Sequence, residues 1–136
     1  MGPLSVAHDC ASGKMTPDPD FPPTQFSPRS GLFRIEGIPW LARMIDKGRA
    51  SLSGTLGEYA YPCAMDDELL KFLGLDSGVF LDLLRITDDE QELVSSLGIS
   101  LRPAAERSIW SDVFMIRYAR LLEELEREEG RKGMEE

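Results

Sequence analysis

Helix start and stop signals follow one another through most of the 136-residue chain, and they constrain its fold more than any other feature. From residue 31 onward, apolar residues recur at helical spacing, and Asp, Ser, Thr, Pro and Gly stand where helices begin and end. Only residues 53–63 alternate in the manner of a strand, and one short strand makes no sheet. The sequence therefore predicts an all-α protein, a compact bundle of about five helices.

The first three helices are predicted from their caps. Residues 38–52 form the first, since Pro39 fits a first helical turn, where its missing N–H would have no partner. Residues 66–73 form the second, with an Asp as N-cap and a Gly just past the end. Asp76 or Ser77 begins the third.

The last two helices are predicted in the same way. The sequence TDDE at 87–90 is a capping-box pattern with the Thr as the cap, and the helix that it opens stops at Gly98. Pro103 then opens a long helix that reaches Glu128. Its middle, residues 113–122, is apolar on more than one face, so we expect this helix to be the central packing element.

Composition divides the chain into three parts. Residues 1–30 hold six of the nine prolines and few branched apolar residues, which predicts a disordered, flexible Pro-rich N-terminal arm. Residues 31–129 are predicted to form a single helical domain. Residues 130–136 are charged and are predicted to be a frayed tail.

The net charge of −9 is unevenly distributed. Residues 66–92 carry nine acids against two bases, whereas residues 29–58 carry five bases against three acids. An acidic chain argues against binding a nucleic-acid backbone, which requires a basic surface. The one basic patch is the right size for a single phosphate or carboxylate.

Other features address location. No apolar run approaches the ~18–20 residues needed to cross a bilayer, and the N-terminus lacks the basic start and apolar core of a signal peptide. Two cysteines cannot build a disulfide framework. We therefore expect a cytoplasmic protein with free thiols and no contact with a membrane.

Several classes of chemistry are excluded by composition. The only histidine, His8, falls in the arm, which argues against a rigid histidine base, a Ser-His-Asp triad or His-ligated zinc. One cysteine in the domain, Cys63, excludes a structural zinc site, and without a histidine to activate it we interpret it as a small buried hydrophobe. No Walker motif or GxGxxG motif is present. We expect no metal and no cofactor.

The basic helix at 38–52 is the best candidate for a binding site. Arg43 and Lys47 stand one turn apart, with Trp40 beside them, and like charges at this spacing disfavour an isolated helix. One hypothesis is that the two cations hold an anion while Trp40 supplies a flat wall. Two alternatives are structural: Asp46 neutralises a solvated row of charges, or an arginine of this helix is buried against Glu58.

The loop at 53–63 is the second candidate. Its glycines at 54 and 57 permit positive φ angles and close backbone approach to a ligand. Glu58 is a carboxylate in this loop. Burial would raise its pKa toward that of a general base, whereas a neighbouring arginine would lower it. Tyr59 and Tyr61 alternate and should point to opposite sides of the loop.

Two long sequences resemble a known family. WLARMIDKGRASLSGTLGEYAYPCAMDDELLKFLGLD at 40–76 and DFPPTQFSPRSGLFRIEG at 20–37 are similar to the signature and the opening of small bacterial proteins known as domain of unknown function 5069. Further on, RPAAERSIWSDVF resembles a family helix, although Trp110 is followed by Ser111 where Asn is common. The resemblance implies a compact, mainly helical, cytoplasmic protein. It implies no activity and no catalytic position.

Two functions from different classes follow. The first is binding, with or without transformation, of a small anionic metabolite at the basic helix and the Gly-rich loop. Its candidate catalytic residues are Glu58 and Tyr59, and its candidate ligand-binding residues are Trp40, Arg43, Lys47, Arg49, Thr55 and Tyr61. The second is a non-catalytic interaction or scaffold module, in which the arm and the acidic helices contact a protein partner.

Overall fold

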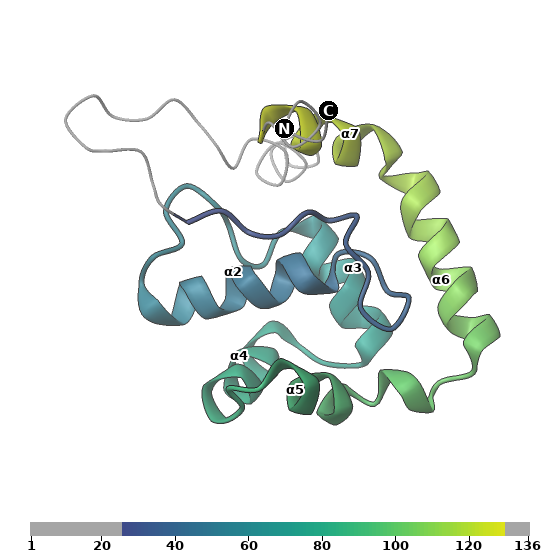
Figure 1. Ribbon diagram of the computed structural model, residues 1–136, viewed down its shortest axis with the longest axis horizontal. Helices are drawn as coiled ribbons and strands as arrows, with labels where there is room; N and C mark the ends of the chain where they lie inside the picture. Colours follow the sequence, from purple (N-terminus) through teal and green to yellow (C-terminus); the bar gives the residue numbers. More distant parts are fainter. Residues whose placement is uncertain (1–25, 130–136) are drawn as a thin grey trace.

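A computed structural model describes residues 26–129 (Figure 1). This part of the chain forms six α-helices and one 3-10 helix and contains no strand, which confirms the all-α prediction. Ile35 and Ile38 form an isolated β-bridge just before the first helix. The predictions for most of the arm and for the tail concern residues 1–25 and 130–136, which lie outside the described residues.

Helix α2 (Leu41–Ser53) lies at the centre of the molecule (Figure 1). Pro39 precedes this helix instead of standing in its first turn, because Trp40 has a left-handed conformation (φ 75°) and occupies the N-cap. One face of α2 packs closely on α4 (Ser77–Ile86) at Gly48, where a Cβ would overlap Leu84 Cδ1. A larger residue at this crossing would force the Leu84 side chain to shift.

The second and third helices begin and end close to their predicted caps. Helix α3 (Ala64–Leu73) starts two residues earlier than predicted, with Cys63 as the N-cap. Asp66 therefore lies in the first turn, where its carboxylate accepts a hydrogen bond from the backbone N–H of Cys63 at 3.0 Å. Asp76 caps α4 as expected, accepting from the N–H of Val79 at 2.9 Å.

Helix α5 (Glu90–Leu97) ends at Gly98 as predicted, but its cap differs from the prediction. Asp89 replaces Thr87 as the N-cap, with its carboxylate accepting from the N–H of Glu92 at 3.1 Å. A 3-10 helix, Ile99–Leu101, then leads to α6.

The prediction of one long, central last helix is wrong. The chain forms α6 (Ala104–Arg117) and α7 (Ala119–Glu128), which meet at Tyr118 (φ −110°, ψ 19°). Helix α6 runs along one edge of the molecule, and α7 turns back toward α2 (Figure 1). Only Ser111 and Phe114 of α6 are buried, while Val113 and Ile116 are 46% and 77% exposed.

The core surrounds α2 and draws side chains from every α-helix. Its large members include Trp40, Met44, Leu69, Phe80, Leu93, Phe114 and Leu122. None of the helices in the described part is both long enough and apolar enough to span a bilayer.

Residues 26–30 contact the helical domain, although their composition assigned them to the arm. Phe26 packs edge-on against Tyr59, with ring centroids 5.4 Å apart. Arg29 forms ion pairs with Asp46 at 3.0 Å and with Glu90 at 2.6 Å. These contacts join the segment before the first helix to both α2 and α5.

Candidate functional site

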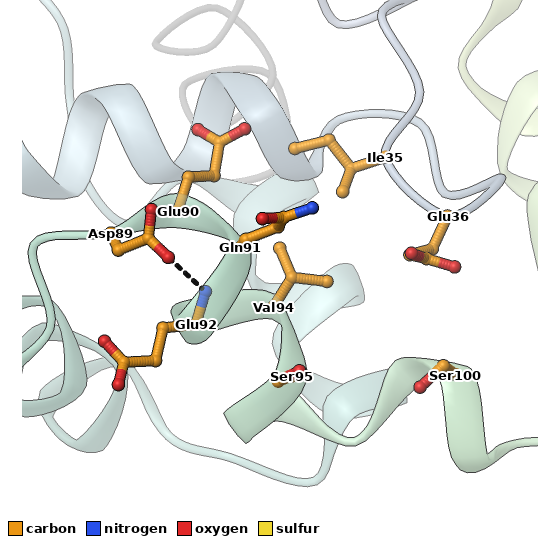
Figure 2. Close-up of a pocket in the computed structure, with 9 residues that line it drawn as sticks. All are labelled: Ile35, Glu36, Asp89, Glu90, Gln91, Glu92, Val94, Ser95 and Ser100. Atoms are coloured by element: carbon orange, nitrogen blue, oxygen red, sulfur yellow. Dashed lines mark hydrogen bonds between the residues drawn. The ribbon is translucent and has the colours of Figure 1, made fainter.

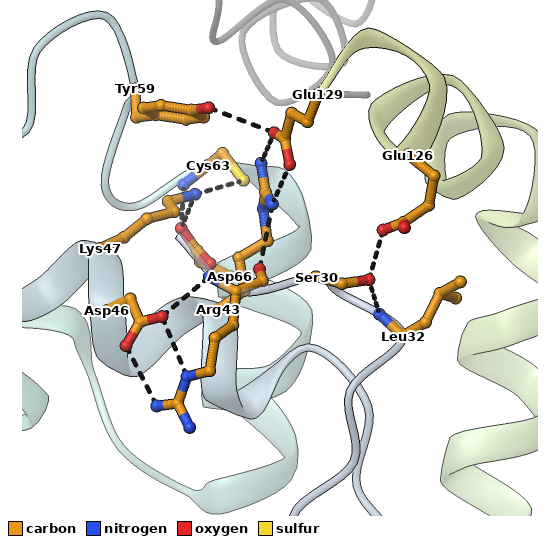
Figure 3. A network of polar contacts seen from close by, with 11 residues as sticks. Ser30, Leu32, Arg43, Asp46, Lys47, Tyr59, Cys63, Asp66, Glu126 and Glu129 are labelled. Atoms are coloured by element: carbon orange, nitrogen blue, oxygen red, sulfur yellow. Dashed lines mark hydrogen bonds and ion pairs between the residues drawn. The ribbon is translucent and has the colours of Figure 1, made fainter. Parts of the chain in front are cut away.

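Four ionisable side chains are buried together between α2, α3 and the residue that follows α7 (Figure 3). Each is at most 3% exposed: Arg43, Lys47, Asp66 and Glu129, which we call the buried charge cluster. Burial of an ionised side chain costs several kcal/mol unless opposite charges and hydrogen bonds compensate it. Two cations and two carboxylates provide that compensation here.

Arg43 holds the carboxylate of Glu129 with both arms of its guanidinium. Its Nη1 donates to Oε1 at 3.1 Å and its Nη2 donates to Oε2 at 2.7 Å, the bidentate geometry typical of arginine and carboxylate. The hydroxyl of Tyr59 donates to the same Oε2 at 3.3 Å. Within the described residues, Nε of Arg43 is buried without a hydrogen-bond partner.

Lys47 pairs with Asp66 in the second half of the cluster. The Lys47 Nζ lies 2.8 Å from Oδ2 of Asp66, and the indole N–H of Trp40 donates to Oδ1 at 2.7 Å. Burial lowers the pKa of Lys47, and Asp66 opposes that change by favouring the charged amine. Asp66 thereby links the first turn of α3 to two side chains from α2 and its N-cap.

Aromatic rings contact both cations. The guanidinium carbon of Arg43 lies 5.3 Å from the centre of the Trp40 ring and 5.5 Å from that of Tyr59. Lys47 Nζ lies 5.6 Å from the Trp40 ring. Such contacts contribute about 2 kcal/mol or more when they are desolvated. Trp40 therefore supports both ion pairs.

The structure brings four of the predicted site residues into this cluster or against it: Trp40, Arg43, Lys47 and Tyr59. They do not line an open hollow with Glu58, which is exposed on the loop after α2. The charge of Arg43 is balanced by Glu129, and Asp46 accepts hydrogen bonds from Arg29.

The remaining predicted residues have other positions. Arg49 donates to the backbone carbonyl oxygens of Leu84 and Thr87 at the end of α4, where a cation is favoured. Tyr61 donates to the carbonyl oxygen of Ser77, and burial raises its pKa. Thr55 is exposed and lines, with Arg49 and other residues, a shallow hollow of about 260 Å³.

Cys63 is buried at 4% exposure and belongs to the hydrophobic core, as its interpretation from the sequence requires. Lys47 Nζ lies 3.5 Å from its sulfur. The expectation of free thiols is wrong at this position, because Cys63 is not a free cysteine in the structure.

Sequence reasoning missed both carboxylates of the cluster. Asp66 carried a signal that was interpreted only as a helix cap, although an acid near a helix start also fits a pair with a cation on a neighbouring helix. Glu129 carried no comparable signal, because it is one of many acids in the last stretch of the chain.

A separate, open hollow of about 630 Å³ lies over the start of α5 (Figure 2). Glu36, Asp89, Glu90 and Glu92 make its lining acidic, and it contains none of the predicted ligand residues. Over the part of the chain that the structure describes, no three or more His, Cys, Asp or Glu side chains are grouped to hold a metal ion.

Comparison with known families matches residues 25–128 to the model described as domain of unknown function (DUF5069). The match spans most of the chain, so the protein belongs to this family. No curated protein matches the sequence significantly. The matched region includes Arg43, Lys47, Tyr59 and Asp66 and ends one residue before Glu129.

Proposed function

We propose that this member of the DUF5069 family binds a small carboxylate-bearing molecule at Arg43, and that Glu129 takes the place of that molecule when none is bound. One observation carries the proposal: a buried guanidinium holds both oxygens of a carboxylate, with a tyrosine hydroxyl on one of them. This donor set is the one that proteins use to recognise a carboxylate by geometry as well as by charge.

The position of Glu129 supports a replaceable carboxylate. Glu129 directly follows α7, so its withdrawal requires movement of the end of one helix and not of the core. With Lys47 paired to Asp66, withdrawal of Glu129 leaves Arg43 as the cation without a counter-charge.

Each donor has a distinct role in the proposed site. Arg43 binds the carboxylate, Tyr59 donates one further hydrogen bond, and Trp40 provides a flat apolar wall. The unpaired Nε of Arg43 offers an additional donor to a ligand that reaches deeper than the Glu129 side chain. Glu58 lies outside this site, and we assign no reaction to it.

Chemical rescue of the full-length Glu129→Ala variant tests this function. The variant leaves a carboxylate-shaped space, so we expect a lowered Tm that acetate, propionate or malonate restores with saturating concentration dependence. Acetamide, which has a similar shape without the charge, should restore little. Glu124→Ala, five residues earlier and on α7, is the matched control and should show no specific rescue.

Two further variants separate this site from general salt effects. Carboxylates should not rescue Glu129→Ala when Arg43→Met is added. If that double variant does not fold, Glu129→Ala with Tyr59→Phe should need several-fold more carboxylate for half-maximal rescue. Equal stabilisation by chloride and by acetate, or no rescue by any carboxylate, would contradict the proposal.

A second candidate function is a protein-interaction module that acts through the outer face of α6. Ile109, Val113 and Ile116 are 64%, 46% and 77% exposed on this helix, and exposed apolar side chains gathered on one face are typical of a docking surface. A pull-down with the full chain should lose its partner after Ile116→Glu and retain it after Ile86→Glu on α4. Equal capture by all three proteins would contradict this function.

A further inference from the structure

We propose that the outer face of α6 binds a second copy of the same chain, with the two α6 helices antiparallel. This inference deepens the second candidate function and rests on it. It does not depend on the carboxylate site.

The contact surface is an apolar stripe on one side of α6. Ile109, Val113 and Ile116 follow one another at four- and three-residue spacing, which places them on the same side of a helix. Ser111 and Phe114, the buried residues of α6, face the core on a different side. The stripe therefore contributes little to the core of its own molecule and is available to another one.

The charges beside the stripe select a second copy as the occupant. Glu106 lies near the start of α6 and Arg117 at its end, about three turns apart and so on the same flank of the stripe. An antiparallel pair brings Glu106 of each copy opposite Arg117 of the other, twice in one contact. A parallel pair would oppose like charges.

Both charged groups remain accessible for this pairing. Glu106 is 51% exposed and has a long contact of 3.8 Å to Arg102. Arg117 is 54% exposed and lies 3.3 Å from Glu68. Ion pairs at this exposure contribute little to the stability of one chain. Breaking them so that Glu106 and Arg117 can pair with a second copy therefore costs little free energy.

The same antiparallel arrangement aligns the apolar residues. The midpoint between Glu106 and Arg117 lies within about one residue of the midpoint of the stripe, so the polar and apolar contacts share one two-fold axis. Ile109 then faces Ile116 of the second copy, and Val113 lies near the axis.

One flanking residue opposes association. Asp112 lies on the other flank of the stripe near the two-fold axis, where the carboxylates of the two copies approach each other. A two-turn contact is also smaller than a standard stable interface. The expected dimer is therefore weak and reversible.

Sedimentation of the full chain over a wide concentration range tests the proposal. We expect the parent to shift from monomer to dimer as concentration rises, and Ile116→Glu to remain monomeric. Ile86→Glu, which changes an equally exposed isoleucine on α4, should dimerise like the parent. Circular dichroism should show the same helix content in all three proteins.

Charge reversal tests the antiparallel register. Glu106→Arg and Arg117→Glu should each weaken the dimer several-fold, and combining them should restore it. Asp112→Asn should strengthen it. A parent that stays monomeric at all concentrations overturns self-association, and a failure of the double reversal to restore the dimer overturns the register. Neither result affects the separate pull-down readout of the second candidate function.

Discussion

The buried charge cluster and the outer face of α6 reverse the usual placement of side chains. Four ionisable groups are at most 3% exposed beside α2, whereas three aliphatic groups on α6 are 46–77% exposed. The difference between them lies in compensation. The cluster is compensated by opposite charges and hydrogen-bond donors within its own chain, while the apolar side chains on the outer face of α6 remain exposed. Buried charges that are compensated within the chain stabilise the fold, whereas exposed apolar side chains without such compensation indicate a surface that binds another molecule.

The largest effect is expected from unbalancing the cluster. Asp66→Ala leaves Lys47 buried without its counter-charge and removes the acceptor for the Trp40 indole, which should cost about 3–5 kcal/mol of unfolding free energy. Urea unfolding measures this loss. Asp67→Ala, at an exposed neighbouring carboxylate, should change stability by less than about 0.5 kcal/mol. Similar losses of stability in the two variants would show that the buried charges of the cluster do not compensate one another.

The apolar side of α2 should be the next most sensitive. Gly48→Ala inserts a methyl group against Leu84, and such overpacking costs about 1–3 kcal/mol despite the better helix propensity of alanine. Gly78→Ala has room in the first turn of α4, where the new Cβ would lie 3.5 Å from Asp76 Oδ1, and should be neutral or stabilising. Thermal unfolding of the two variants checks this contrast. A neutral Gly48→Ala would mean that α2 and α4 are less tightly packed than the structure indicates.

A half-exposed ion pair should have a smaller effect that depends on pH. The hydrogen bond from Arg29 lowers the pKa of Glu90 below its ordinary value of 4.5, so the folded state keeps this carboxylate ionised where the unfolded chain is protonated. Stability from this pair is present above about pH 4.5 and is lost as pH falls through the folded pKa. Glu90→Gln should therefore flatten the acid limb of a plot of stability against pH, by about 1 kcal/mol or less.

The control for this pH effect is Asp82→Asn, which removes an exposed i,i+3 pair with Arg85 on α4. Because both partners are exposed, this change should alter the unfolding free energy at neutral pH by less than about 0.5 kcal/mol. A lowered carboxylate pKa affects stability between roughly pH 5 and pH 3. If Glu90→Gln and the parent lose stability in parallel over this range, the Arg29 pair does not contribute to acid stability.

The smallest effect on folding is expected on the outer face of α6. Ile116→Ser, measured where the chain is monomeric, should change the unfolding free energy by less than about 0.5 kcal/mol, because this side chain is largely exposed. Denaturant titration at low protein concentration is the appropriate measurement. A loss above 2 kcal/mol would mean that Ile116 belongs to the core, and the contrast with the cluster would disappear.

Local chemistry made most of the fold predictable from the sequence. Gly74, Asp76 and Gly98 stand at helix ends because a left-handed turn or a side-chain cap is required there, and neither depends on distant residues. The break at Tyr118 lacked such a signal, since no proline or glycine marks it. Helix α7 turns back through contacts that are distant in sequence, such as the hydrogen bond from Ser30 to Glu126.

The candidate site was predictable only in part for the same reason. The i,i+4 spacing correctly grouped Arg43 and Lys47 on one face of a helix. Whether that face was solvated or buried depended on carboxylates far along the chain, and Glu129 is 86 residues from Arg43. Glu58 is much closer in sequence but lies exposed.

The joint at Tyr118 has a consequence for both proposed sites. Helices α6 and α7 are separated by this single residue, so there is no slack between them. Because Glu129 directly follows the ten-residue α7, a movement of α6 that displaced Tyr118 would also displace the carboxylate that Arg43 binds.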